Sequence, residues 1–294
     1  MAGELGSAIR NRVCLGESEI VKRKGVYRPT IEDAVEISGI ETLHPGGFAL
    51  TRRTAEVAGV RPGMKVLDVS SGRGTQAVYY AQEFGADVTG IDISTEMVQA
   101  ATALAAQAGL GARVRFERGD SQALPFDDAA FDIVINECAV GIPDDSQCVI
   151  DEMVRVVKPG GRIAIHESTW RRPLSAARKD EIAERYGTTP LEHAEWIEML
   201  EHAGAEDIQS ELEPWSAPDN FWRVRQERDV TGPSDILTLA ERIRTVWRIL
   251  RQYGLRGVFT ALRNERMFYR TILDGSLGYG LYWGVRPGVA SFSG

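Results

Sequence analysis

The chain has 294 residues, enough for one large domain or two modest ones with a core of their own. Its 34 basic and 42 acidic residues give a formal charge of −8, which argues against a general nucleic-acid-binding protein. Hydrophobic residues make up 43% of the chain, which excludes wholesale disorder. There is no transmembrane apolar run and no apolar signal core in residues 1–10, so we expect a cytoplasmic protein.

Short apolar runs alternate with helical patterns along most of the chain. Two helices come first, at residues 30–38 and 48–58. Strands are then expected at 65–69, 87–92, 113–117, 131–136 and 162–166, with helices at 75–84, 94–108 and 145–157 between them. This alternation predicts an α/β fold: an open parallel sheet covered by helices on both faces. A ligand is expected at the rim formed by the carboxyl ends of the strands.

The pattern changes after residue 170. A helix is expected at 190–204, a sixth strand at 207–213, a helical and aromatic region at 218–274, and a final strand at 278–285. The helical region contains a strongly basic segment, residues 221–270, with eleven arginines against five acids. That segment therefore carries +6, which leaves −14 on the rest of the chain. The acidic average thus conceals a basic region.

The run Val66-Leu-Asp-Val-Ser-Ser-Gly-Arg-Gly74 leads from the first strand through a tight turn into a helix. Glycines in such a turn let the backbone approach a ligand, and the helix points its first amides at it. Asp92 ends the second strand, where a carboxylate can accept both hydroxyls of a ribose. Gly119-Asp120 follows the third strand, and a Lys-Pro-Gly-Gly turn at 158–161 precedes the fifth. These features together favour a nucleotide-type cofactor.

In this order and spacing, the four motifs resemble the class I S-adenosylmethionine-dependent methyltransferases over residues 42–213 and the last strand. The nearest pattern is the ubiquinone/menaquinone-biosynthesis and arsenite methyltransferase branch. The resemblance implies a Rossmann-like, doubly wound sheet of seven strands, with the last strand antiparallel between the fifth and the sixth. It also implies methyl transfer from S-adenosyl-L-methionine, with S-adenosyl-L-homocysteine as product. The expected acceptor is a small molecule, methylated by in-line displacement.

The resemblance also implies which residues hold the cofactor. An acid and two glycines would line the methionine moiety, a second acid would bind the ribose, and a third would meet the adenine. Ser70 stands where the family commonly has glycine, and we expect ordinary backbone angles there. The cofactor-binding residues implied are Asp68, Ser70, Gly72, Gly74, Asp92, Ile93, Asp120, Ser121 and Asn136.

Two other functions fit part of the pattern. An NAD-dependent oxidoreductase would use Gly72-x-Gly74-x-x-Ala77 and Asp92, but it does not require Asp68 or the Gly119-Asp120 pair. A catalytically inactive, cofactor-binding partner subunit would keep all four motifs. Only binding and activity measurements separate the second alternative from an enzyme.

Methyl transfer mainly needs an oriented and desolvated acceptor, so few catalytic residues are expected. The candidates at the strand rim and its approach are Glu137, His166, His44 and Cys138. Each has a simpler interpretation: a supporting hydrogen-bonding group for Glu137 or His166, a loop residue for His44, and a small buried hydrophobe for Cys138. The four histidines lack metal-ligand spacing, so no metal site is expected.

The expected domain organisation has four parts. Residues 1–45 form an N-terminal helical lid segment, 46–214 the cofactor-binding domain, 215–275 an Arg-rich insert, and 276–294 the last strand and tail. Helical spacing of apolar residues from 236 to 250 predicts that one face of the insert packs. The insert has three interpretations: a solvated helix pair or homodimer surface, a cap that selects an anionic or aromatic substrate, and a contact with an anionic membrane.

Overall fold

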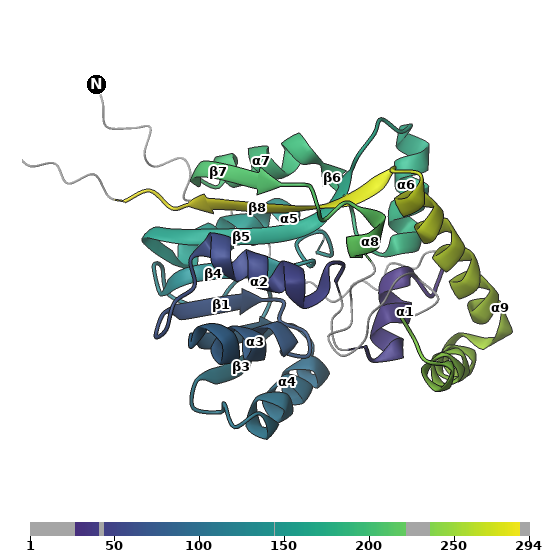
Figure 1. Cartoon of the computed structure of the whole chain (residues 1–294), viewed down its shortest axis with the longest axis horizontal. Helices are drawn as coiled ribbons and strands as arrows, with labels where there is room; N and C mark the ends of the chain where they lie inside the picture. The colour runs from purple at the N-terminus through teal and green to yellow at the C-terminus, as the bar shows by residue number, and fades with distance from the viewer. Residues whose placement is uncertain (1–26, 41–43, 144, 222–235, 289–294) are drawn as a thin grey trace, which may run out of the picture.

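The computed structural model describes residues 27–40, 44–143, 145–221 and 236–288, and a central sheet dominates them (Figure 1). The strand order is β3-β2-β1-β4-β5-β8-β7, and β8 runs antiparallel to both of its neighbours. This confirms the Rossmann-like sheet with its last strand inserted beside the fifth. The strands are β1 (Lys65–Val69), β2 (Asp87–Asp92), β3 (Val114–Arg118), β4 (Phe131–Glu137), β5 (Val157–Trp170), β7 (Glu206–Glu211) and β8 (Leu277–Val285).

Two layers of helices cover the sheet. Successive side chains of β1 point to opposite faces of the sheet. Val66 packs in the cluster with α2, α3 and α4, whereas Leu67 packs in the cluster with α5 and α7. Both residues are fully buried. The helices of the first layer are α2 (Gly47–Ala58), α3 (Thr75–Phe84) and α4 (Thr95–Gln107), and those of the second are α5 (Ser146–Val156) and α7 (His193–His202).

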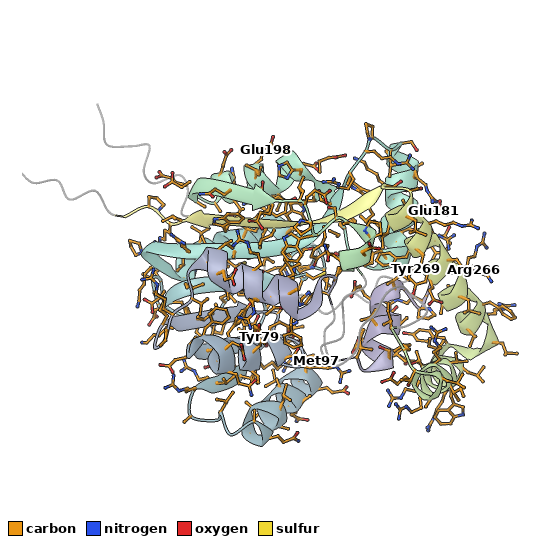
Figure 2. All side chains as sticks on the ribbon, viewed as in Figure 1. Tyr79, Met97, Glu181, Glu198, Arg266 and Tyr269 are labelled. Atoms are coloured by element: carbon orange, nitrogen blue, oxygen red, sulfur yellow. The ribbon has the colours of Figure 1, made fainter. Side chains whose placement is uncertain are left out.

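A third group of helices packs at one end of the sheet. It consists of α1 (Ile31–Ser38), α6 (Ala176–Tyr186) and α9 (Leu239–Leu273), with the four-residue α8 (Pro218–Phe221) nearby. Their apolar side chains form one cluster with the end of β5 and the start of β8. Helices α6 and α9 contact each other, and Figure 2 labels Glu181 on α6 and Arg266 and Tyr269 on α9. No sequence pattern predicted α6 or the two-residue strand β6 (Leu191–Glu192), which pairs with β5.

The apolar face predicted for residues 236–250 is wrong in part. Leu239, Ile243 and Trp247 are 75%, 62% and 57% exposed, so this row does not pack against the rest of the described chain. The residues that α9 buries include Thr245, Ile249 and Phe268 instead. Arginines at 223, 225 and 228 lie outside the described residues. Hydrophobic spacing located the helix correctly but did not identify the face that packs against the protein.

Asn264 joins α9 to the segment that leads into α1. Its side-chain amide donates to the carbonyl oxygens of Tyr27 (2.8 Å) and Pro29 (2.9 Å). Its own oxygen accepts a hydrogen bond of 2.9 Å from Arg185 of α6. Because Asn264 is fully buried, this one side chain satisfies polar groups from two other segments, the one before α1 and helix α6.

We expect Asn264→Ala to lower the free energy of unfolding by about 2 kcal/mol, because the Tyr27 and Pro29 carbonyls and the Arg185 guanidinium each lose a hydrogen bond. Urea unfolding measures this. Asn220→Ala is the control, since Asn220 makes a single exposed hydrogen bond to the Pro214 carbonyl. Equal losses in the two variants would show that Asn264 does not hold these helices together.

Candidate active site

A cavity of 1630 Å³ lies between the carboxyl ends of the strands and the group of α1, α6 and α9. Cofactor candidates from the sequence form one wall. Met97 lies at the start of α4, on the side that faces α1 (Figure 2), and also lines the cavity. The predicted site residues on the wall are Asp68, Ser70, Gly72, Asp92, Ile93, Asp120, Ser121, His44, Glu137 and Cys138.

The turn after β1 brings the backbone to this cavity. Gly74 has a φ of 77°, and a side-chain carbon there would lie 2.5 Å from the Phe116 ring and 2.7 Å from Ala101. Ser70 has a φ of 57°, so the expectation of ordinary angles at Ser70 is wrong. The strain of this conformation, about 1–2 kcal/mol, is offset within the turn. The Ser71 amide donates to the Ile91 carbonyl oxygen at 2.9 Å and ties the turn to β2.

Asp92 is fixed at the end of β2 by two backbone amides. Gly72 donates to its Oδ2 at 2.9 Å, and Ser94 donates to its Oδ1 at 2.8 Å. Burial raises the pKa of the Asp92 carboxyl, while these two hydrogen bonds oppose the rise. Each oxygen retains a lone pair for a further donor. Asp92 therefore stands ready to accept hydrogen bonds from two hydroxyls.

Asp68 lies deeper in the same wall and is 2% exposed. Within the described part of the chain, its Oδ2 atom has no hydrogen-bond partner. Burial, with repulsion from Glu137 and Asp92, raises the pKa of Asp68 well above its usual value. An unpaired buried carboxyl oxygen costs free energy unless a ligand supplies a donor or a positive charge.

Asn136 lies apart from the cavity. Its side chain is fully buried, its amide donates to the Val69 carbonyl at 3.1 Å, and its oxygen accepts from the Ala139 amide at 3.0 Å. It thus links β1 to β4 behind the wall. Its contact with the cofactor stays a prediction, whereas Asp120 lines the cavity and accepts a 2.9 Å hydrogen bond from the Gln122 amide.

Three of the four catalytic candidates meet in one buried cluster. Glu137 ends β4, His166 lies on β5, and His44 comes just before α2. Glu137 Oε2 lies 2.9 Å from His44 Nε2 and 3.1 Å from His166 Nε2. The side chains are 3% exposed or less. His44 and Glu137 line the cavity, while His166 lies behind Glu137.

Two hydroxyl groups complete the surroundings of Glu137. Thr51 donates to Oε2 at 2.8 Å, and Tyr80 donates to Oε1. Burial by itself raises the pKa of Glu137, but the neighbouring rings of His166 and His44 lower it below its usual value. Burial lowers the pKa of His166 to about 4, against the opposing charge of Glu137. At neutral pH the cluster thus presents an ionised carboxylate next to an uncharged His166.

Cys138 follows Glu137 and has a φ of 62°. It lines the cavity but is 9% exposed, and burial raises the pKa of its thiol well above the usual value. A thiol that keeps its proton is a poor nucleophile and a poor ligand for a soft metal. The geometry therefore favours the simple interpretation of Cys138 as a small buried side chain.

Sequence reasoning missed the residues that surround the cluster. Thr51 lies within α2, Tyr80 within α3, and Tyr279 within β8, where its hydroxyl lies 3.2 Å from His166 Nδ1. Each occupies an ordinary position in its element, so no local signal marks it. Glu167 follows His166 on β5 and is fully buried: burial raises its pKa to about 7, and the Val140 amide donates to it at 2.6 Å.

The doubly wound sheet, the glycine turn after β1 and the carboxylate at the end of β2 define a class of protein. They are typical of Rossmann-like domains that hold a nucleoside-containing cofactor at the rim of the sheet. The model of the family described as "Methyltransferase domain" matches residues 61–213, which is more than half of the chain. The chain therefore belongs to the class I S-adenosylmethionine-dependent methyltransferase family.

Relatives of the chain carry methyltransferase names. Methyltransferase GfsG of Streptomyces halstedii is 38% identical over 138 residues, which is 47% of this chain and 49% of that protein. Ubiquinone/menaquinone biosynthesis C-methyltransferase UbiE of Idiomarina loihiensis is 35% identical over 127 residues, 42% of this chain and 50% of that protein. The chain thus spans about half the length of these curated relatives.

Solved structures show the same fold at low identity. Phosphoethanolamine N-methyltransferase 2 of Haemonchus contortus, solved with S-adenosyl-L-methionine, is 23% identical with a TM-score of 0.65 over 86% of this chain and 56% of that one. The [4+2]-cyclase SpnF is 23% identical with a TM-score of 0.63 over 82% of each chain. The fold alone therefore does not fix the reaction. Among the described residues, no helix is long and apolar enough to cross a membrane.

Proposed function

We propose that this protein transfers the methyl group of S-adenosyl-L-methionine to a hydroxyl oxygen of a small-molecule acceptor. One observation carries the proposal: the cofactor-type wall with Asp92 and the buried cluster of Glu137 and His44 line the same cavity. A cofactor on that wall and an acceptor against the cluster would meet inside a cavity that α1 and α9 border. The sulfonium already activates the methyl group, so orientation and exclusion of water supply most of the catalysis.

The residues present fit the cofactor. Asp92, with both oxygens held by backbone amides, would accept the ribose hydroxyls. The unpaired Oδ2 of Asp68 would face the positively charged methionine moiety, which explains a buried carboxyl without a partner. Ile93, Asp120 and Ser121 would surround the adenine. S-adenosylmethionine supplies the methyl group as an electrophile when bound.

The acceptor would be held by the chain's own groups. The ionised Glu137 can accept a hydrogen bond from a hydroxyl and so align its oxygen for in-line attack. The cap side of the cavity carries Arg248, Arg251 and Trp247. Cationic and aromatic side chains there support an anionic or aromatic acceptor.

We expect Asp92→Ala to weaken S-adenosyl-L-methionine binding about tenfold or more, because a charge-assisted pair of hydrogen bonds is lost. Calorimetric titration measures the affinity. Asp87→Ala, at the other end of β2, is the matched control, since Asp87 is half exposed and only pairs with Arg113 at 3.7 Å. Unchanged affinity in Asp92→Ala would refute the ribose role.

Methyl transfer itself is tested with cofactor labelled in the methyl group. The protein is incubated with fractionated small-molecule extract, and label that moves into a new compound identifies the acceptor. We expect transfer to an oxygen atom. If the cofactor binds but no fraction takes up label, the inactive partner-subunit alternative replaces the enzyme. If the product carries the label on carbon or nitrogen, the hydroxyl acceptor is wrong.

A further inference from the structure

The cluster of His44, Glu137 and His166 has the composition and geometry of a metal site. Each residue offers one ligand atom, and the three atoms lie within 4.8 Å of one another. Two imidazole nitrogens and one carboxylate oxygen form a donor set typical of zinc and other divalent transition metals. The three residues come from β4, β5 and the segment just before α2, so no local spacing in the sequence could reveal the set.

The hydrogen bonds of His44 leave its other nitrogen directed at the carboxylate. His44 Nδ1 lies 2.8 Å from the Pro45 carbonyl oxygen, which can only accept, so Nδ1 carries the hydrogen. Nε2 lies 2.9 Å from Glu137 Oε2 and 3.3 Å from the Thr51 hydroxyl. Where Nε2 carries no hydrogen, a cation or a proton must lie between it and the carboxylate oxygen. A backbone carbonyl behind the outer nitrogen is the usual support for a metal-bound histidine.

His166 shows the same arrangement. Its Nδ1 lies 3.2 Å from the Tyr279 hydroxyl, while its Nε2 lies 3.1 Å from Glu137 Oε2. Within the described chain, this Nε2 is fully buried and makes no contact of hydrogen-bond geometry. A buried nitrogen that lies 3.1 Å from a carboxylate oxygen but makes no hydrogen bond is the second observation that points to a ligand.

We propose that His44, Glu137 and His166 bind one divalent transition-metal ion, with zinc as the representative. Tyr80, which donates to the other oxygen of Glu137, would fix the carboxylate from behind. Because His44 and Glu137 line the cavity, the remaining coordination positions face it. The ion would coordinate the acceptor oxygen at the place where the proposed function puts the hydroxyl, so the proposed role of the metal rests on that function.

Metal binding is measured directly, without any acceptor. Protein without a histidine tag is stripped with a chelator, dialysed and titrated with Zn²⁺ by calorimetry, and with Co²⁺ by visible absorption. We expect one tight site per chain, and visible Co²⁺ bands of a site with nitrogen and oxygen ligands. Glu137→Gln and His166→Ala should each weaken binding by roughly tenfold or more. His202→Ala, on the exposed end of α7, should bind as the unchanged protein does.

Folding is checked separately, because a buried substitution can unfold the chain. Zn²⁺ should raise the Tm of the unchanged protein and not that of Glu137→Gln, which keeps the shape of the side chain. No Zn²⁺ binding, or equal binding in Glu137→Gln, would overturn the metal site. Methyl transfer by the metal-free protein would overturn only the metal's role, whereas metal binding without any methyl acceptor would contradict only the proposed function.

Discussion

Glu137→Gln should lower the rate of methyl transfer about 100-fold or more while S-adenosyl-L-methionine binds almost as before. The amide keeps the size of the side chain but loses the negative charge that Thr51 and Tyr80 hold in place. The acceptor oxygen would then lack the group that aligns it. The cofactor should be little affected, because Asp92 and the turn after β1 form a separate part of the wall.

The rate is measured with the label-accepting compound from the extract, and affinity by calorimetry. Glu83→Gln is the matched control, because Glu83 lies at the end of α3 and pairs with Arg52 at the surface. It should transfer methyl groups at the normal rate. A loss of only about twofold in Glu137→Gln would show that Glu137 does not align the acceptor for methyl transfer.

Trp196→Ala should lower the free energy of unfolding by about 3–5 kcal/mol, the usual cost of emptying a large aromatic site in a core. Trp196 of α7 is fully buried, and its indole donates to the Ser168 carbonyl at 3.2 Å. The substitution therefore removes apolar contacts and leaves a buried carbonyl without that donor.

Urea unfolding followed by circular dichroism measures the loss. Trp247→Ala is the control, since Trp247 of α9 is 57% exposed and should cost little. If the two variants lost the same free energy, α7 would not be packed as described here.

The sequence predicted the sheet well because its signals are local. Apolar runs placed β1, β2 and β4 almost to the residue, and glycine ended α3 as expected. Gly72, Asp92 and Asp120 reached the cavity because the connections of a parallel sheet bring strand ends to one rim. The positions of these residues depend on the topology of the sheet. The alternation of strands and helices in the sequence predicted that topology.

The rest of the site depends on contacts between distant segments. His44 was a catalytic candidate with a loop residue as its simpler interpretation, and the packing of α2 beside β5 brings it to Glu137. The exposed row on α9 is separated by a break at Gly254 from Asn264, Phe268 and Ile272, which pack against the rest of the chain. Ser70 adopts a positive φ because the whole turn, not the residue's own preference, sets its backbone.

A crystal structure with S-adenosyl-L-homocysteine bound tests the central claim, that one cavity joins the cofactor wall to the Glu137 cluster. We predict that the ribose hydroxyls contact Asp92 and that the sulfur faces the space in front of Glu137 and His44. A sulfur atom directed away from Glu137, or a cofactor bound outside this cavity, would contradict the account.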